Sequence, residues 1–126
     1  MAWQRVRLEL ARSHDFPEGS YRHGYEIVLP LTPLGQIDYA VLEKAPELCT
    51  VHRFWSGEGD SVGQIVHEGD NWTISYDEGE DEVLLHFADH RFREGEYIAV
   101  RNARGDEHAF RIVKVRPEPG LAPSTA

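Results

Sequence analysis

The sequence predicts a mainly β fold, a small antiparallel β-barrel-like or sandwich domain of seven to eight strands with one short helix. Apolar and polar residues alternate in short segments along most of the 126 residues, which is the period of a half-buried strand. Clusters of glycine and polar residues separate these segments at hairpin spacing. Of the two architectures we favour the barrel, because closure leaves no strand edge exposed.

The first two strands are predicted near the N-terminus. Val6, Leu8 and Leu10 alternate with charged residues, and apolar residues continue this period over 25–31. Pro30 cannot donate a backbone hydrogen bond, so we place the end of the second strand at a sheet edge or beyond pairing.

A single helix is predicted after the second strand. Ile37, Ala40, Val41 and Lys44 recur at helical spacing, and Pro46 follows them. Because proline interrupts a helix, we expect the helix to run from Ile37 to Lys44.

The next four strands form a predicted β-meander. They are expected at 50–55, 61–67, 72–76 and 82–87. In the third of them Trp72, Ile74 and Tyr76 share one face, since side chains alternate along a strand. By the same rule Val83 and Leu85 share one face of the fourth strand with Phe87.

Two further strands, at 96–101 and 108–116, complete the predicted domain. In the last strand two pairs of apolar residues have opposite parity, Phe110 with Ile112 and Val113 with Val115. Either both faces of this strand are covered or a bulge shifts its register.

Residues 1–116 are therefore interpreted as one β-rich domain. The proline-containing stretch 117–126 is expected to be a disordered tail. Cys49 is the sole cysteine, which excludes an intramolecular disulfide. No apolar run approaches the roughly 18 residues of a membrane helix, and the N-terminus lacks a signal-peptide pattern, so we expect a cytoplasmic location.

The charge of the chain is concentrated in one segment. Thirteen Lys and Arg against 22 Asp and Glu give a net charge of -9, which disfavours nucleic-acid and anionic-membrane partners. Residues 54–90 contain no Lys or Arg and ten of the acidic residues. Because apolar residues interrupt this segment regularly, we interpret it as folded strands with acidic loops rather than as a disordered block.

Several segments resemble a small family of uncharacterised bacterial proteins from alphaproteobacteria. They are 5–12, 22–26, 49–55, 87–92 and 95–98, and the resemblance extends from about Trp3 to Arg116. It implies a bacterial cytoplasmic domain and transfers no activity, cofactor or catalytic residue.

Aromatic residues provide one candidate site. We assign Phe87, Tyr97 and Phe110 to the core. Parity places Trp55 opposite its neighbour Phe54, so one of these two rings is expected to face outward. An outward Trp55, together with Trp72 or Tyr76 and the acidic loops, would form an aromatic surface with an acidic rim. Our first hypothesis is therefore a non-catalytic binding or interaction module, with a protein partner or a second copy of the chain.

Histidine chemistry provides the main alternative. A small metal-dependent or histidine-based enzyme would use His52, His86, Asp89 and His90, because imidazole binds metals and titrates near neutral pH. Their spacing fits no zinc-finger or His-Glu-x-x-His pattern, so we predict no metal, no cofactor and no catalytic residue. The alternative interpretation is that residues 89–93 form a charged turn after the meander.

The candidate binding residues from both hypotheses are His52, Arg53, Trp55, Trp72, Tyr76, His86, Asp89, His90 and Arg91. A third hypothesis, an acidic mimic of nucleic acid, requires the carboxylates of 54–90 to lie on one face. A calcium loop is disfavoured, because the glycine of 77–82 comes too early for an EF-hand.

Overall fold

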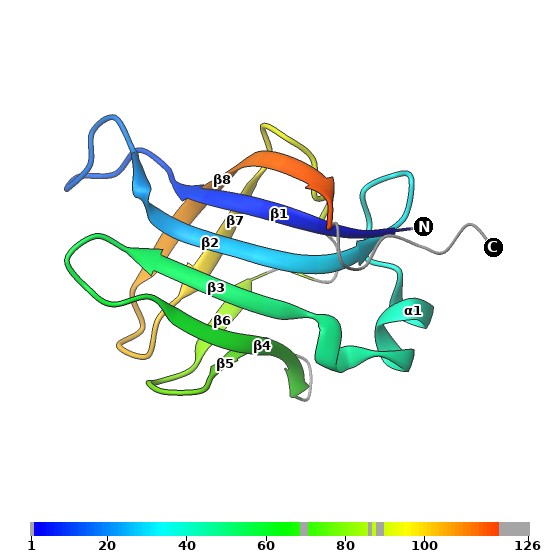
Figure 1. The fold of residues 1–126 in the computed structure, drawn as a ribbon. Helices are drawn as coiled ribbons and strands as arrows, with labels where there is room; N and C mark the ends of the chain where they lie inside the picture. Colours follow the sequence, from blue (N-terminus) through cyan, green and yellow to red (C-terminus); the bar gives the residue numbers. More distant parts are fainter. Residues whose placement is uncertain (1, 69–70, 86, 88–89, 119–126) are drawn as a thin grey trace.

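The computed structural model describes residues 2–68, 71–85, 87 and 90–118, and these residues form a closed antiparallel barrel (Figure 1). Its strands are β1 (Ala2–Leu10), β2 (Ser20–Leu31), β3 (Thr50–Trp55), β4 (Ser61–Glu68), β5 (Asn71–Tyr76), β6 (Glu82–Leu85), β7 (Tyr97–Arg101) and β8 (Glu107–Pro117). Each strand pairs with its neighbours in sequence, and β8 pairs with β1 to close the ring. The mainly β class, the strand number and the barrel architecture are thus confirmed.

Alternation along the strands fills the barrel interior with side chains. Val6, Leu8 and Leu10 of β1 are buried, as their period predicts. In a barrel of eight strands the inward side chains meet at the centre and leave little space between them. The described residues accordingly form one continuous apolar core that draws on every strand.

The helix begins later than the sequence predicted. α1 spans Tyr39–Lys44, and the side chain of Asp38 caps it by accepting a 3.3 Å hydrogen bond from the Val41 amide. The predicted start at Ile37 is wrong, because Ile37 is extended and forms a β-bridge with Leu31. An aspartate at the N-cap takes non-helical backbone angles, so the helix cannot extend in front of it.

Pro30 lies inside β2 but at an edge of its pairing. It faces Trp3 of β1, whereas β3 pairs with β2 only from His23 to Ile27. The carbonyl of Pro30 accepts a 2.8 Å hydrogen bond from the Asp38 amide, so the segment before α1 covers this side of the strand. The position is compatible with proline because no partner needs its missing N–H.

A bulge resolves the mixed parity of the last strand. Arg7 faces Lys114 and the next residue, Leu8, faces Ile112, so one extra residue of β8 is accommodated there. The bulge interpretation is confirmed. β8 continues to Pro117, one residue beyond the predicted domain boundary, and the predicted tail from residue 119 onward lies outside the described residues.

Two predicted orientations differ from the structure. β6 ends at Leu85, and its buried positions are Glu82 and Leu84 rather than the predicted apolar face of Val83 and Leu85. Phe87 is 1% exposed, but it lies after the strand.

Tyr97 was also assigned wrongly. It is 55% exposed, because its neighbours Ile98 and Val100 take the inward positions of β7.

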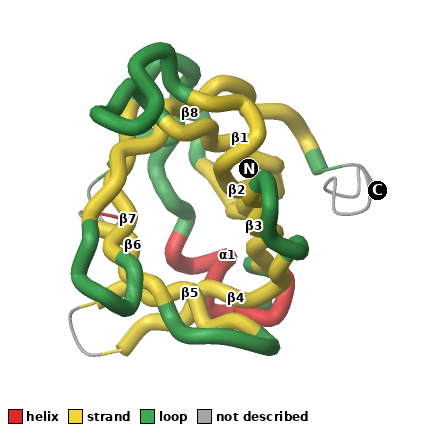
Figure 2. The backbone as a smooth tube through the Cα atoms, turned by 90° about the vertical axis from the view of Figure 1, so that its left-hand side faces the viewer, coloured by secondary structure: helices red, strands yellow, loops and turns green. Residues whose placement is uncertain are grey.

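Different elements lie at the two ends of the barrel. The connections β1–β2, β3–β4, β5–β6 and β7–β8 lie at one end, here called the loop end, at the left of Figure 1. α1 lies at the opposite end, here called the helix end, and Leu42 of α1 packs into the core. Figure 2 shows the ring of strands with the helix behind it.

Candidate binding site at the loop end

A polar cluster lies inside the barrel near the loop end. Glu82, the first residue of β6, has only 8% of its surface exposed. Its Oε1 accepts hydrogen bonds from the hydroxyl of Tyr25 at 2.8 Å and from the hydroxyl of Tyr76 at 2.5 Å. Because β2 and β6 are not neighbours in the ring, the first of these bonds crosses the interior.

Arg53 supplies the positive charge of this cluster. Its side chain points inward with that of Val51, and its Nε lies 3.9 Å from Oε2 of Glu82. The Nε is buried and has no hydrogen-bond partner among the described residues. One Nη donates at 3.3 Å to Glu58 in the β3–β4 loop, so Arg53 connects the interior to the loop end.

Burial fixes the protonation of the two tyrosines. It raises the pKa of Tyr25 and of Tyr76 above the ordinary tyrosine value, and the negative charge of Glu82 adds to the effect. Both hydroxyls therefore keep their protons at neutral pH and donate to the carboxylate. A buried carboxylate is tolerated when hydrogen bonds and an opposite charge replace its water shell.

Aromatic rings surround the positive end of the cluster. The Arg53 guanidinium lies 4.4 Å from the centre of the Trp55 ring. His23 packs edge-on to Trp55 at 4.6 Å, and its Nδ1 lies 2.6 Å from the hydroxyl of Ser20. Burial, followed by the charge of Arg53, lowers the pKa of His23, so this ring is neutral at pH 7.

Phe54, next to Trp55, faces the opposite way. Its ring lies 4.3 Å from the guanidinium carbon of Arg7 on the outside of the barrel. The prediction that one of these two rings faces outward is confirmed, and the outward ring is Phe54. Trp55 packs partly buried against the core, so it is not part of an outer aromatic surface.

The other two predicted aromatic residues also point inward. Trp72 packs against Phe87 at 5.4 Å, and its ring stacks on His67 at 4.2 Å. Tyr76 binds Glu82. The face shared by Trp72, Ile74 and Tyr76 is confirmed, but it faces the barrel core rather than solvent.

The predicted polar residues are spread over both ends. His52 points outward from β3, and its Nε2 lies 2.9 Å from Asp60 at the loop end. His90 follows β6, packs edge-on to Phe92, and has a buried Nε2 without a partner among the described residues. Burial lowers its pKa. Arg91 is exposed.

His86 and Asp89 lie outside the described residues. Among the residues that the structure does describe, no three His, Cys, Asp or Glu side chains gather closely enough to hold a metal ion. Cys49 is fully buried, and burial raises the pKa of its thiol to about 12. It packs as a small apolar residue, as is usual for a free cysteine in a core.

The acidic loops create a hollow at the loop end. The hollow has a volume of about 480 Å³ and lies between the β3–β4 and β5–β6 loops, and its lining includes Asp60, Val62, Asp77 and Glu78. A separate space of about 490 Å³ lies on another surface of the barrel. Val62, one of the residues lining the hollow, is 52% exposed. Asp77 and Glu78 form no ion pair with any described residue. Their charges are therefore available to a partner.

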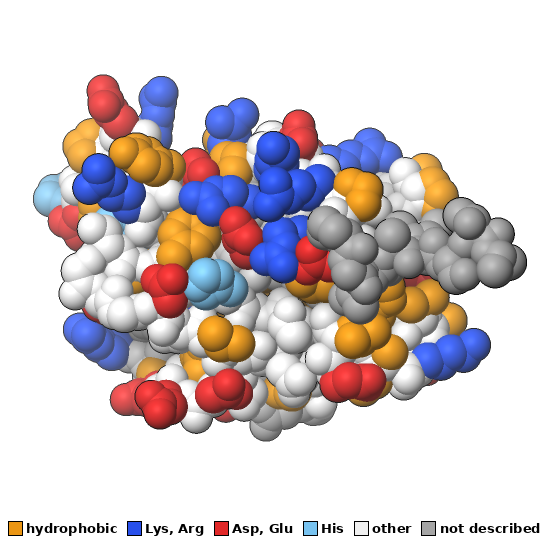
Figure 3. Space-filling model, in the orientation of Figure 1, with side chains coloured by type: hydrophobic (Ala, Val, Ile, Leu, Met, Phe, Trp, Pro, Cys, Tyr) orange, Lys and Arg blue, Asp and Glu red, His pale blue; other side chains and the backbone are white. Residues whose placement is uncertain are grey.

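Charge is divided over the barrel surface. Figure 3 shows Lys and Arg side chains gathered over β1 and β8, and Asp and Glu side chains along the side formed by β4 and β5. The sequence predicted acidic loops within 54–90, and among the acidic residues whose exposure the structure describes there, Glu58, Asp60, Asp77, Glu78, Glu80 and Asp81 are exposed. Glu82 differs from these, because it is buried.

Sequence reasoning missed the two residues at the centre of the polar cluster, Tyr25 and Glu82. The one available signal was the parity of Glu82, which places it on the same face of β6 as the apolar Leu84. The sequence analysis assigns the apolar face of 82–87 to Val83, Leu85 and Phe87, which would turn Glu82 outward, whereas the structure buries Glu82 and Leu84. Tyr25 gave no signal, since a tyrosine in an apolar strand is an ordinary core residue.

Comparisons of the chain with protein-family models, with curated proteins and with solved structures found no match. Within the described residues no helix is both long and apolar enough to cross a membrane.

Proposed function

We propose that this protein is a non-catalytic binding module whose loop end binds a basic segment of a partner protein. The observation that carries the proposal is the hollow between the β3–β4 and β5–β6 loops. There an exposed Val62 is flanked by the carboxylates of Asp60, Asp77 and Glu78. An apolar centre with a charged rim is the usual composition of a protein interaction surface.

The charge of the loop end favours a cationic partner. Residues 54–90 contain no Lys or Arg, and although Arg53 is paired with Glu58 and His52 with Asp60, Asp77 and Glu78 form no ion pair with a described residue. Lys and Arg side chains also bring an aliphatic stem, which can lie on Val62 while the charged group meets a carboxylate. Charge complementarity of this kind mainly gives specificity and faster association.

The buried polar cluster around Glu82 is connected to both loops that line the hollow. The hydrogen bond from Arg53 to Glu58 holds the β3–β4 loop, while Tyr76 and Glu82 flank the β5–β6 loop at its two ends. Both walls of the hollow are therefore attached to one buried network. This favours a preformed site, in which little ordering is needed on binding.

A labelled nine-residue peptide of alternating lysine and leucine tests the proposal. The protein should bind it more tightly than the matching glutamate–leucine peptide. The Asp77→Asn/Glu78→Gln variant should weaken binding about tenfold, since two exposed ion pairs contribute up to about 1 kcal/mol each. Raising the salt concentration should weaken binding in the wild type more than in the variant.

The matched control is Glu43→Gln/Glu47→Gln, which makes the same change of net charge at exposed positions of the helix end. It should leave peptide affinity nearly unchanged. Equal losses in the two variants would mean that only the overall charge of -9 attracts the peptide, and the proposed site would be rejected.

The nucleic-acid mimic is a special case of the same chemistry, because its partner also presents a basic surface. It is favoured by the six exposed carboxylates on two neighbouring loops. A competition experiment distinguishes the nucleic-acid mimic from a module that binds other basic segments. A DNA duplex should displace this protein only from a partner that uses the same basic surface for nucleic acid.

A further inference from the structure

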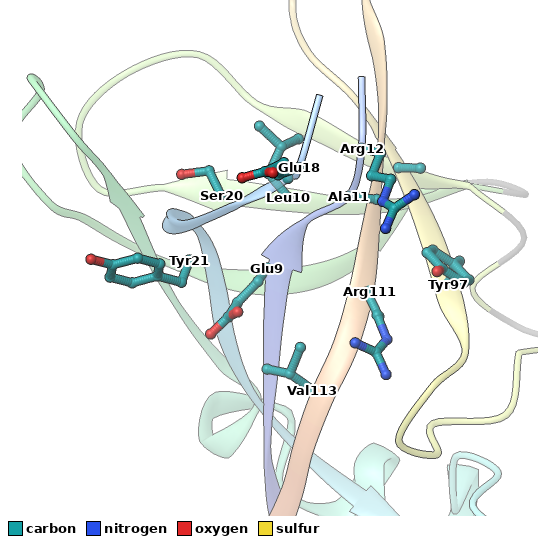
Figure 4. A pocket seen from close by; sticks show the side chains of 12 residues that line it. Glu9, Leu10, Ala11, Arg12, Glu18, Ser20, Tyr21, Tyr97, Arg111 and Val113 are labelled. Carbon is teal, nitrogen blue, oxygen red and sulfur yellow. The ribbon is translucent and has the colours of Figure 1, made fainter. Parts of the chain in front are cut away.

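A second surface, over β1 and β8 where Lys and Arg side chains gather, has the features of a ligand site. It is a groove of about 790 Å³ on the outer face of β1 and β8, next to the β1–β2 loop (Figure 4). Binding sites for small molecules commonly have volumes of about 300–1,000 Å³. The groove does not include any residue of the acidic hollow.

Two arginines without partners line the groove. Arg12 follows β1 and Arg111 lies in β8, and the side chain of neither forms a hydrogen bond or an ion pair with a described residue. On β1 itself the arginines Arg5 and Arg7 are both paired with Glu26, whereas Arg116 of β8, outside the groove, forms no ion pair with a described residue. The groove therefore brings together two guanidinium groups that no described side chain neutralises.

The carboxylate opposite Arg111 is bonded to another arginine. Glu9 is directly opposite Arg111 in the register of β1 and β8. Its Oε2 instead accepts a 2.8 Å hydrogen bond from Nε of Arg7. Cross-strand neighbours of opposite charge normally pair, so this alternative pairing leaves the Arg111 guanidinium available. Glu18 is the remaining acidic residue of the lining, and it is exposed at the rim.

An aromatic ring stands beside the two cations. Tyr97 is opposite Arg111 in the register of β7 and β8, and 55% of its surface is exposed. In Figure 4 the side chains of Arg12, Arg111 and Tyr97 lie on the same side of β8. Ala109, with a small side chain, also lines the groove.

We infer that this groove binds a small aromatic anion, a planar ring that carries a phosphate or a carboxylate group. The guanidinium groups of Arg12 and Arg111 hold the anion, because arginine binds both oxyanions in a bidentate manner. Tyr97 stacks on the ring of the ligand. This inference does not depend on the proposed loop-end function, since the two sites share no residue.

Phenyl phosphate and benzoate are the probes, with inorganic phosphate for comparison, and two-dimensional NMR of the full chain gives the readout. Both aromatic anions should shift the signals of Arg12, Arg111 and Tyr97 with millimolar affinity. Phenyl phosphate should bind more tightly than inorganic phosphate, and the ratio of phenyl phosphate to benzoate affinity identifies the preferred anion.

Three variants separate the contributions. Arg111→Gln and Arg12→Gln should each weaken phenyl phosphate binding at least fivefold. Tyr97→Leu should remove the preference for phenyl phosphate over inorganic phosphate while the affinity for inorganic phosphate is retained. The matched control is Arg104→Gln, an exposed arginine in the β7–β8 turn, which should change the affinity less than twofold.

Other outcomes would overturn the inference. Equal binding of phenyl phosphate and inorganic phosphate by the wild type would exclude the stacking role of Tyr97. An equal loss in Arg104→Gln would show attraction by the surface as a whole. A ten-residue oligothymidylate that binds through the same residues more than a hundredfold more tightly than phenyl phosphate would assign the groove to single-stranded nucleic acid instead. Thermal unfolding of each variant checks that the fold is unchanged.

Discussion

The two ends of the barrel interior are filled in different ways. At the helix end Phe87 and Phe92 pack edge-on at 5.3 Å, and apolar contact is the main interaction. At the loop end the interior holds a carboxylate that accepts hydrogen bonds from two phenols and lies 3.9 Å from a guanidinium nitrogen. Apolar packing tolerates small changes of shape, whereas a buried polar network depends on every partner being present. The loop end is therefore specified by its hydrogen bonds and the helix end by its volume.

The greatest loss of stability is expected from a substitution at the helix end. Phe92→Ala should destabilise the protein by about 3–5 kcal/mol, because it removes a ring that is only 1% exposed and leaves a cavity. Phe92→Leu keeps most of the volume and should cost less than half as much. Urea unfolding measures both. Similar costs for the two variants would show that volume is not what the helix end requires.

A smaller effect is expected from the network at the loop end. Glu82→Gln should cost about 2 kcal/mol, since the charged acceptor of two tyrosine hydroxyls is replaced by a neutral one. Tyr76→Phe should cost about 1 kcal/mol. In the double variant the costs should fall short of their sum, because the second change finds the bond already lost.

Urea unfolding of the two single variants and the double variant gives the coupling energy. Strict additivity would show that the short contact between Tyr76 and Glu82 contributes nothing of its own. Glu107→Gln, an exposed carboxylate of β8 at 3.5 Å from Arg101, is the control and should stay within about 0.5 kcal/mol of the wild type.

The smallest effect is a pH dependence of the free energy of unfolding, to which one histidine at each end contributes. Burial lowers the pKa of His23 at the loop end and of His90 near the helix end below 6.5. Above pH 6.5 both rings are neutral in the folded and the unfolded chain, so they add no pH dependence there. Below it the unfolded chain takes up protons first, and the free energy of unfolding should fall as the pH is lowered.

Unfolding between pH 7.5 and 5.0 measures this effect, and His23→Gln and His90→Gln assign it to one end or the other. Although burial raises the pKa of Glu26, hydrogen bonds from Arg5 and Arg7 lower it below its ordinary value of 4.5. Its stabilising effect is therefore complete above pH 4.5 and does not interfere in this range. A free energy of unfolding that rises on acidification in the wild type would contradict the prediction.

Local periodicity in the sequence was enough to predict most of the strands. Alternation along Val6–Leu10, 50–55 and 72–76 specified strands, because a strand turns every second side chain to the same face. The same pattern specified the meander, and the opposite parities in β8 required either a bulge or two covered faces. The helix was found through its spacing, but its start was misplaced, since Ile37 pairs with Leu31 through a tertiary contact.

Contacts between distant side chains depend on closure of the barrel and could not be predicted from local pattern. Tyr25 and Glu82 are 57 residues apart in the chain, and their hydrogen bond exists because closing the ring brings β2 and β6 to face each other across the interior. Closure also turned Trp55, Trp72 and Tyr76 inward and Tyr97 outward. Period alone separates the two faces of a strand, but the face that becomes the interior is chosen by the whole barrel, through the apolar area that each choice buries.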